Sequence, residues 1–228
     1  QVVRDGAGWW YYTVPWGPPY NVQPPWASAM AQGFALSGLM RAYQETENPA
    51  YRRAADLALR SFEVGVEDGG IVSRDEWDNV FYEEVPSQPP HHILNGHIFA
   101  LFGLHDYYRA TGVERARELF EQGVDAVRNR LPDYDAGFWS KYSLNPNADW
   151  RSHWNLAAPI YQRVHVDLLR FLHKITGDPV FERWAARWER QQRTPVGRLL
   201  EVAFVIFKDG VWLGKQLRYL QTRGGRGG

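Results

Sequence analysis

Two adjacent carboxylates, Glu83 and Glu84, are the residues of this chain most suited to proton chemistry. They lie in the segment 77–96, which begins at Trp77, places Tyr82 beside the acids and runs through three prolines into a helical pattern. Each proline fixes its own φ and keeps the preceding residue out of the helical region, so this backbone is extended and stiff. Paired acids among aromatic rings at a helix start favour a sugar-binding site. The alternative is a surface loop with solvated glutamates.

A second candidate group lies further along the chain. Tyr161 and His165 are four residues apart near the start of a helical pattern, so they share one face of that helix. Tyr142 lies in the aromatic loop that precedes it. If this helix start meets the loop of Glu84, the phenols and the carboxyl share one site. The alternative is that Tyr161 is a core aromatic and His165 a hydrogen-bonded core histidine.

The charge balance argues against a nucleic-acid partner. Basic and acidic side chains each number 26, so the formal net charge is zero and local arginines must hold any anionic ligand. The chain has no cysteine, which excludes a disulfide framework and a thiol nucleophile. No apolar run approaches the ~20 residues of a transmembrane helix. No histidine pair has the spacing of a zinc helix, so neither a metal nor another cofactor is predicted. The start at Gln1 is compatible with processing from a longer secreted or membrane-associated protein, and the compartment is left open.

A helical pattern recurs three times at an offset of 65 residues (39 to 104 to 169). Each copy ends in a threonine, which is followed by a turn signal and a second amphipathic helix. Self-similarity at a fixed offset indicates one structural unit stacked on itself. The matching positions are Leu36, Gly38, Leu39, Tyr43 and Thr46, then Leu101, Gly103, Leu104, Tyr108 and Thr111, then Val166, Leu168, Leu169, His173 and Thr176. The sequence predicts a mainly α fold, an incomplete (α/α) toroid of repeated helical hairpins with short β-hairpins in the loops at one rim.

A long loop precedes the first helix of each predicted pair, over 9–26, 69–90 and 133–156. These loops are rich in aromatic residues, proline and glycine. Because the pairs stack in parallel, all three loops enter the toroid at the same end. Loops longer than ~12–15 residues are uncommon unless they carry function. We therefore expect the three loops to form the walls of one substrate cleft.

The chain divides into three predicted parts. Residues 1–194 form the catalytic toroid. Residues 195–221 do not follow the repeat. Their apolar pattern predicts a helical extension that closes the toroid or pairs two chains in a homodimer. A membrane-surface helix is the lesser alternative, since its polar face is not especially basic. Residues 222–228 are glycine-rich and are expected to be disordered.

Five sequence blocks, in the same order, resemble the D-glucuronyl C5-epimerases of heparan-type polysaccharides, and they cover about residues 8–194. The blocks are W-A-S-A-M-A-Q-G from Trp26 with Arg41-Ala-Tyr43, Tyr82-Glu-Glu-x-Pro86, Leu94-Asn-Gly96 with Gly103-Leu-x-Asp106, Leu131-Pro-x-Tyr-Asp-x-Gly137 with Tyr142, and Tyr161-x-x-x-His165. The resemblance implies an epimerase, without a cofactor, that converts D-glucuronate to L-iduronate in a heparosan-like acidic polysaccharide.

The resemblance also implies roles for individual residues. Tyr142 and Tyr161 correspond to the acid/base tyrosines, which remove the C5 proton from one face of the sugar and return a proton to the other. Glu84 corresponds to an acid beside the substrate carboxylate. The resemblance implies that Gln32, Asn95 and His165 orient the sugar. Further candidates for substrate contacts are Tyr82, Glu83 and Trp77, and either Arg151 or Arg163 is the candidate to hold the anionic chain.

One position departs from the family pattern. A third functional tyrosine of the family falls on Val85, and valine transfers no proton. Either Tyr82 substitutes for it, or Tyr142 and Tyr161 suffice, or the activity has changed. Tyrosine is a poor base at its ordinary pKa of ~10 unless positive charge or hydrogen bonds stabilise its phenolate.

Three other functions fit the same residues. A uronan lyase begins with the same proton abstraction and then expels the C4 substituent. A glycoside hydrolase would need Asp135 beside one of the two glutamates, because adjacent residues on an extended strand face opposite ways. A non-catalytic glycan-binding protein would bind the polymer without turnover.

Overall fold

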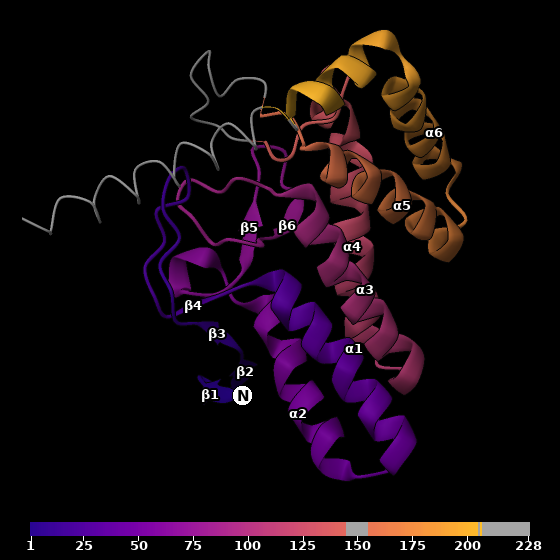
Figure 1. The fold of residues 1–228 in the computed structure, drawn as a ribbon. Helices are drawn as coiled ribbons and strands as arrows, with labels where there is room; N and C mark the ends of the chain where they lie inside the picture. Colours follow the sequence, from indigo (N-terminus) through magenta and orange to yellow (C-terminus); the bar gives the residue numbers. More distant parts are fainter. Residues whose placement is uncertain (145–154, 205, 207–228) are drawn as a thin grey trace, which may run out of the picture.

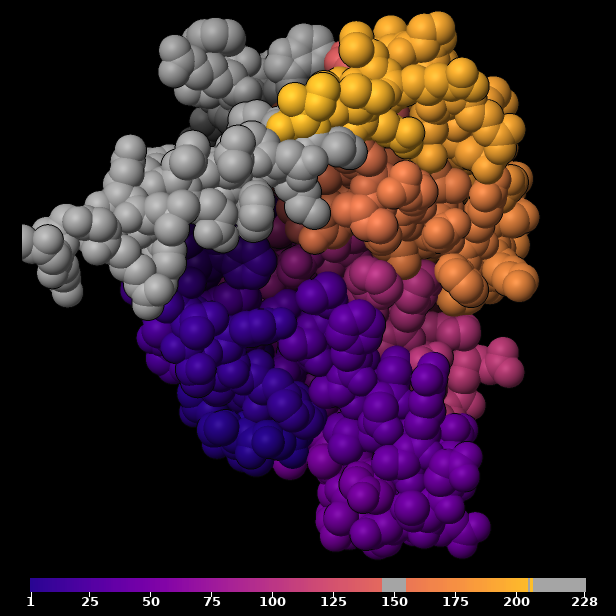
Figure 2. All heavy atoms as spheres, viewed as in Figure 1, coloured from indigo at the N-terminus to yellow at the C-terminus, as the bar shows by residue number. Residues whose placement is uncertain are grey.

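The computed structural model describes residues 1–144, 155–204 and 206. Within them, six α-helices form three pairs stacked in chain order (Figure 1). The pairs are α1 (Ala29–Thr46) with α2 (Pro49–Arg60), α3 (Leu94–Thr111) with α4 (Glu114–Arg130), and α5 (Pro159–Thr176) with α6 (Pro179–Arg193). Figure 2 shows the same order on the surface, from the first pair at the bottom of the view to the third at the top.

The first helices of the pairs begin at 29, 94 and 159, so consecutive copies are offset by 65 residues (94 − 29 and 159 − 94). Helix α3 packs against both α1 and α5, and the second helix of each pair packs mainly against its own partner. The first helices therefore form an inner row and the second helices an outer row. This arrangement confirms the predicted repeat and the mainly α, incomplete (α/α) toroid.

Each inner helix ends in the threonine that marks the repeat. The hydroxyl of Thr46 donates to the carbonyl of Ala42 and accepts from the amide of Asn48. Thr111 and Thr176 make the same two bonds, one turn back and two residues ahead. The residue after each threonine has a positive φ, which turns the chain out of the helix. One hydroxyl thus shapes the turn into the outer helix in all three copies.

Short antiparallel strand pairs occupy the segments before α1 and α3. The pairs are β1 (Val2–Arg4) with β2 (Ala7–Trp9), β3 (Tyr11–Tyr12) with β4 (Trp26–Ala27), and β5 (Val72–Arg74) with β6 (Val80–Tyr82). Three 3₁₀ turns, Ser61–Glu63, Val66–Asp68 and Leu131–Tyr134, follow the outer helices α2 and α4. The β3–β4 pair joins the two ends of the first long loop, and β2 packs on α2.

A buried polar side chain at the fourth position of each inner helix connects the preceding loop to the outer helix. These residues are Gln32, His97 and Gln162, which again differ by 65 (97 − 32 and 162 − 97). Gln32 accepts a hydrogen bond from the amide of Trp10 at 2.9 Å and donates to Ser61 Oγ at 2.8 Å. Buried polar side chains need hydrogen-bond partners, so these bonds hold each side chain in one position.

The other two copies repeat this connection with different chemistry. His97 Nδ1 accepts from the amide of Tyr82, and Nε2 faces the carbonyl of Gly123 at 3.0 Å. Gln162 accepts from the amide of Ser140 and donates to the carbonyl of Trp188. We call Gln32, His97 and Gln162 the tie residues. They hold the long loops in register with the helices behind them.

The chain continues in helical conformation over residues 195–204. The remainder of the predicted extension 195–221, apart from Ile206, and the predicted disordered tail 222–228 lie outside the described residues. Among the described helices, none is long and apolar enough to cross a membrane.

Candidate active site at the rim of the helix pairs

The N-terminal ends of α1, α3 and α5 form a rim where the long loops enter (Figure 1). The amide of Ala29, the first residue of α1, donates to the carbonyl of Glu83, and the amide of Leu94, the first residue of α3, donates to the carbonyl of Tyr142. Each of these loops is therefore bonded to the inner helix of the preceding pair. This is how residues from different repeats reach one place.

The phenols of Tyr142 and Tyr161 meet at this rim. Their rings lie edge to face with centroids 4.8 Å apart. Besides its bond to Leu94, Tyr142 donates its amide to the carbonyl of Asn155 at 2.7 Å, so its backbone is held from both sides. Burial, and then the charge of Glu84, raise the pKa of Tyr142 far above the ordinary value of 10. Tyr142 is therefore a protonated phenol at neutral pH.

Glu84 is the carboxyl of the site. It is buried, and Asn95 Nδ2 donates to its Oε2 at 3.2 Å. Burial, opposed by the Asn95 bond and helped by the charge of Glu83, raises the pKa of Glu84 from 4.5 to about 7. The side chain packs over Gly96, where an added Cβ would lie 2.2 Å from Oε2, so the position must be a glycine. A carboxyl with this pKa can both hold and release a proton near neutral pH.

The side chain of Asn95 has one polar atom that makes no hydrogen bond among the described residues. This atom is Oδ1, and it is buried. A buried acceptor without a partner is costly, and ligand binding is one way to satisfy it. The atom lies at the rim, because Asn95 is the second residue of α3.

Glu83 lies beside Glu84 in sequence but faces the interior. Its side chain is completely buried, accepts from Ser73 Oγ at 2.5 Å and from the amide of His92 at 3.1 Å, and contacts His92 Nδ1 at 2.7 Å. These partners occupy both carboxylate oxygens. The predicted substrate contact of Glu83 does not fit this position, and the carboxylate instead holds the loop in place.

Three further predicted site residues also lie in buried networks. Tyr82 donates its hydroxyl to the carbonyl of Leu119 in the core, so it cannot stand in for the missing tyrosine at Val85. Gln32 is a tie residue whose amide groups are both used within the fold. His165 is fully buried, with Nδ1 against Ser140 Oγ, and burial lowers its pKa to about 3. The polar groups of Tyr82 and Gln32 are thus used within the fold, whereas the buried Nε2 of His165 has no hydrogen-bond partner among the described residues.

Trp77 and Arg163 are exposed, and their contacts among the described residues are with side chains other than the two phenols. Arg151, the other candidate to hold the anionic chain, lies outside the described residues. Trp77 is 63% exposed, and the guanidinium of Arg130 lies 4.3 Å from the centre of its ring. Arg163 pairs with Glu201 at 3.5 Å. It is two residues from Tyr161 on the same helix, and residues at that spacing do not face each other.

The first long loop brings Tyr20, which no sequence pattern singles out, to the same rim. A buried cluster of Val22, Trp26, Val85 and Ile93 forms the floor there, and Tyr12, Tyr20 and Tyr142 pack against it. One signal for Tyr20 was available in the sequence. The three long loops are equivalent in the repeat, and the candidates Glu84 and Tyr142 come from the second and third loops, so the first loop was expected to contribute a residue as well. We call Tyr20, Glu84, Asn95, Tyr142 and Tyr161 the rim site.

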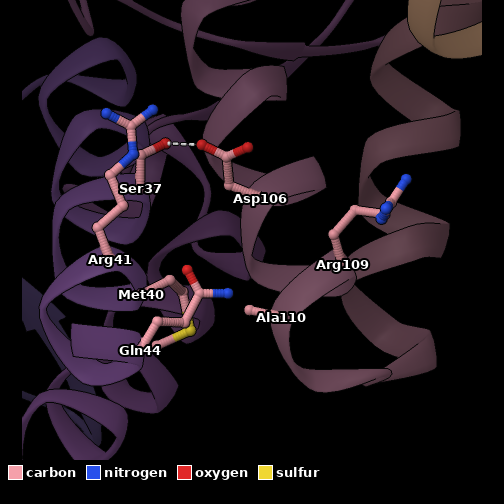
Figure 3. Close-up of a pocket in the computed structure, with 7 residues that line it drawn as sticks. All are labelled: Ser37, Met40, Arg41, Gln44, Asp106, Arg109 and Ala110. Carbon is pink, nitrogen blue, oxygen red and sulfur yellow. Dashed lines mark hydrogen bonds between the residues drawn. The ribbon is translucent and has the colours of Figure 1, made fainter. Parts of the chain in front are cut away.

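A separate cavity of about 210 Å³ lies between the C-terminal halves of α1 and α3 (Figure 3). Arg41 and Arg109 line it, and Ser37 Oγ donates to Asp106 Oδ2 at 2.6 Å within it. Twelve residues of α1 separate Arg41 from Ala29 at the rim (41 − 29), which corresponds to roughly 18 Å along a helix. The cavity is therefore distinct from the rim site.

The fold resembles that of two solved cellobiose 2-epimerases. The Spirochaeta thermophila structure gives a TM-score of 0.54 at 19% identity, over 84% of this chain and 48% of that chain. The Bacillus thermoamylovorans structure gives 0.53 at 17% identity, over 82% and 49%. At these identities the likeness shows the fold alone. The molecule is thus an α/α-toroid protein with phenols and a carboxyl gathered at one rim.

The family follows from sequence. Residues 4–190 match the family described as D-glucuronyl C5-epimerase C-terminus. A D-glucuronyl C5-epimerase of Caenorhabditis elegans is 35% identical over 177 residues, which is 72% of this chain and 28% of that protein. An uncharacterized protein of Methanocaldococcus jannaschii is 31% identical over 182 residues, 78% of this chain and 56% of that protein. The chain therefore belongs to the D-glucuronyl C5-epimerase family, a family of carbohydrate epimerases. It spans about a quarter and about half of the length of these two relatives.

Proposed function

We propose that this chain inverts C5 of D-glucuronate units in an acidic, heparosan-like polysaccharide and so forms L-iduronate. The proposal rests on one observation: Tyr142 and Tyr161 meet beside a carboxyl, Glu84, whose pKa is raised to about 7. The reaction needs a base, an acid for the opposite face of the sugar and a donor to the uronate carboxylate, whose charge otherwise opposes the forming carbanion. The three side chains offer one group for each task.

In this proposal Tyr161 is the base and Tyr142 the acid. Tyr142 is kept protonated chiefly by burial, and its hydroxyl is hydrogen-bonded to Tyr161. A phenol that donates to a neighbouring oxygen favours the charged form of that oxygen. We therefore assign Tyr161, the more exposed of the two phenols, as the group that takes the C5 proton.

The proposed steps balance in protons. Tyr161 acts as a phenolate that has first released its own proton to solvent. The C5–H bond breaks as this phenolate takes the proton, and the electron pair spreads into the uronate carboxyl group, to which protonated Glu84 donates a hydrogen bond. Tyr142 then gives its proton to the other face of C5. Since Tyr161 has gained a proton and Tyr142 has lost one, a transfer between the two phenols restores the starting state.

The sugar must lie between the phenols for this reaction. A ring centroid separation of 4.8 Å leaves no room for it, because two carbon contacts of 3.5–4 Å need roughly 7–8 Å. Tyr161 is 37% exposed on the first turn of α5, so it is the ring with freedom to move. We therefore expect substrate binding to separate the two rings.

Incubation with a panel of glucuronate polymers in heavy water tests the proposal. An epimerase incorporates deuterium at C5 and leaves the chain length unchanged. Unsaturated chain ends would instead identify a lyase, and new reducing ends without deuterium a hydrolase. The hydrolase has little support, because Asp135, its required second acid, is paired with Arg187 and Gln191.

A non-catalytic glycan-binding protein makes a different prediction in the same experiment. It would bind the polymer with neither deuterium uptake nor cleavage, and a Tyr142→Phe, Tyr161→Phe double variant would bind and behave identically. Deuterium uptake by the unmodified chain that is abolished in the double variant would exclude this alternative.

A further inference from the structure

Tyr20 lies at the tip of a hairpin formed by the first long loop. Trp16 and Val22 exchange both backbone hydrogen bonds at 3.0 Å, and the amide of Tyr20 donates to the carbonyl of Gly17 at 3.2 Å. The loop thus has a defined backbone that carries Tyr20 at a fixed place, and its base is closed by the β3–β4 pair.

Two contacts fix the ring of Tyr20. It lies edge to face on the imidazole of His91, with ring centroids 4.8 Å apart, and His91 is itself buried and held by Ser87 Oγ at 2.7 Å. The ring also packs against the cluster that contains Val85, as does the ring of Tyr142. One cluster therefore packs against both phenol rings.

The hydroxyl of Tyr20 belongs to the same electrostatic unit as the other rim groups. It is hydrogen-bonded to Ser143, the residue after Tyr142, and it lies within electrostatic range of Glu84 and Tyr161. Burial, followed by Glu84, raises the pKa of Tyr20 to about 12. At neutral pH the group is a neutral phenol that can donate a hydrogen bond, which suits a negatively charged ligand.

We propose that Tyr20 is a third phenol of the rim site and donates a hydrogen bond to the bound uronate. Each of the three equivalent long loops then supplies one polar group to the sugar, namely Tyr20, Glu84 and Tyr142. Tyr82 cannot fill this role because its hydroxyl is committed to Leu119 in the core. The inference rests on the proposed function, and it assigns to the first loop the phenol that Val85 does not provide.

The role is binding rather than proton transfer. A hydrogen bond to the sugar that is present before and during the reaction lowers KM and leaves kcat nearly unchanged. Loss of an acid or base instead lowers kcat by at least ~100-fold. The two roles are therefore separated by which kinetic constant changes.

The test compares Tyr20→Phe with Tyr12→Phe as a matched control. Tyr12 packs against the same cluster and stacks on Trp26 with ring centroids 4.4 Å apart. For Tyr20→Phe we expect kcat/KM for C5 exchange on a glucuronate polymer to fall roughly 10-fold or more, mainly through KM, as for loss of a hydrogen bond to a charged group. For Tyr12→Phe we expect a change of less than about twofold, since its ring is retained.

Equal kinetics for the two variants, with the unmodified chain active, would overturn the assignment of Tyr20 and leave the proposed function intact. An unmodified chain that exchanges no deuterium at C5 would instead overturn the proposed function. Tyrosine nitration of the unmodified chain, read by mass spectrometry, tests the contact independently of any variant. Bound polymer should protect Tyr20 and leave the exposed Tyr51 on α2 reactive, and equal protection or none would contradict the contact.

Discussion

The ring of Tyr142 meets the ring of Tyr161 edge to face at 4.8 Å, although the two residues come from different elements. Tyr142 is anchored through its backbone to the first residue of α3, whereas Tyr161 belongs to the first turn of α5. Their contact therefore crosses the seam between two helix pairs. A site assembled in this way depends on the stacking of the repeats as much as on the phenols themselves.

Replacing Tyr161 with phenylalanine is expected to lower the rate of C5 deuterium exchange by at least ~100-fold, because the variant retains the ring and loses the proton carrier. The same loss is expected for Tyr142→Phe. Proton NMR of the polymer after incubation in heavy water measures the rate. Tyr51→Phe, on the outer helix α2, is the matched control and should match the unmodified chain. A drop of less than threefold for Tyr161→Phe would remove this residue from the mechanism.

The pH dependence of the reaction should follow Glu84. Since its pKa is raised to about 7 and the protonated form donates to the substrate, kcat/KM should fall as the pH rises through about 7. Glu84→Gln keeps a neutral donor and cannot ionise, so its profile should lose this fall even if its maximal rate is lower. Glu76→Gln, at an exposed position of the same loop, is the control. A fall near pH 7 that persists in Glu84→Gln would assign the ionisation to another group.

Glu84 should also make stability depend on pH. The pKa of Glu84 is the ordinary 4.5 in the unfolded chain and about 7 in the folded chain, so the folded chain holds this proton more tightly. Stability is therefore lost as the pH rises from 4.5 to 7, and at most about 3 kcal/mol is lost at 1.36 kcal/mol per pKa unit. In urea unfolding, Glu84→Gln should be more stable than the unmodified chain at pH 8 and equal to it near pH 4. The opposite trend would mean that Glu84 is ionised and well paired in the folded chain.

The tie residues should matter for stability rather than for sugar binding. Gln32→Leu leaves the amide of Trp10 and the carbonyl of Gly8 without this buried partner, and each buried unpaired group costs ~1–3 kcal/mol. We expect a loss of at least ~2 kcal/mol in the free energy of unfolding, measured by urea titration. Gln44→Leu, on the exposed face of the same helix, should change it by less than ~0.5 kcal/mol. If Gln32→Leu were stable but bound polymer poorly, Gln32 would return to the candidate site.

The repeat could be predicted from sequence because its cause is local. The threonine at the end of each inner helix closes the turn with bonds to residues four before and two after it, so the same residue type recurs at the same offset. The tie residues escaped prediction for the opposite reason. Gln32, His97 and Gln162 perform one task with partners 15 to 29 positions away, and two residue types serve equally well.

The rim site was predictable only in part. Glu84, Asn95, Tyr142 and Tyr161 could be selected by residue type and motif, but the side of the backbone that each faces could not. Glu83 and Glu84 illustrate this, because one points into a buried network and its neighbour into the rim site. Tyr20 escaped because its loop has no periodic pattern that would indicate which of its aromatic residues lie at the tip.

The contact between the first two inner helices depends on glycines that have no room for a side chain. A Cβ at Gly103 of α3 would lie 2.3 Å from the carbonyl oxygen of Gly33 on α1. The carbonyl oxygen belongs to the backbone of α1 and the added Cβ is bonded directly to the backbone of α3, so neither atom can move alone and Gly103→Ala must push the helices apart. We expect it to lower the free energy of unfolding by ~1–3 kcal/mol or more, as other overpacked cores do.

Gly38→Ala on α1 is the matched control, since nothing lies within 4 Å of its added Cβ. Alanine is the better helix former, so this variant should gain up to ~1 kcal/mol. The two variants should therefore change the free energy of unfolding, measured by urea titration, in opposite directions, although the chemical change is the same. Because α1 and α3 carry Ala29, Leu94 and Asn95 at the rim, Gly103→Ala should also weaken C5 exchange while Gly38→Ala leaves it unchanged. Equal and small effects in both variants would show that the helices do not approach as closely as 2.3 Å implies.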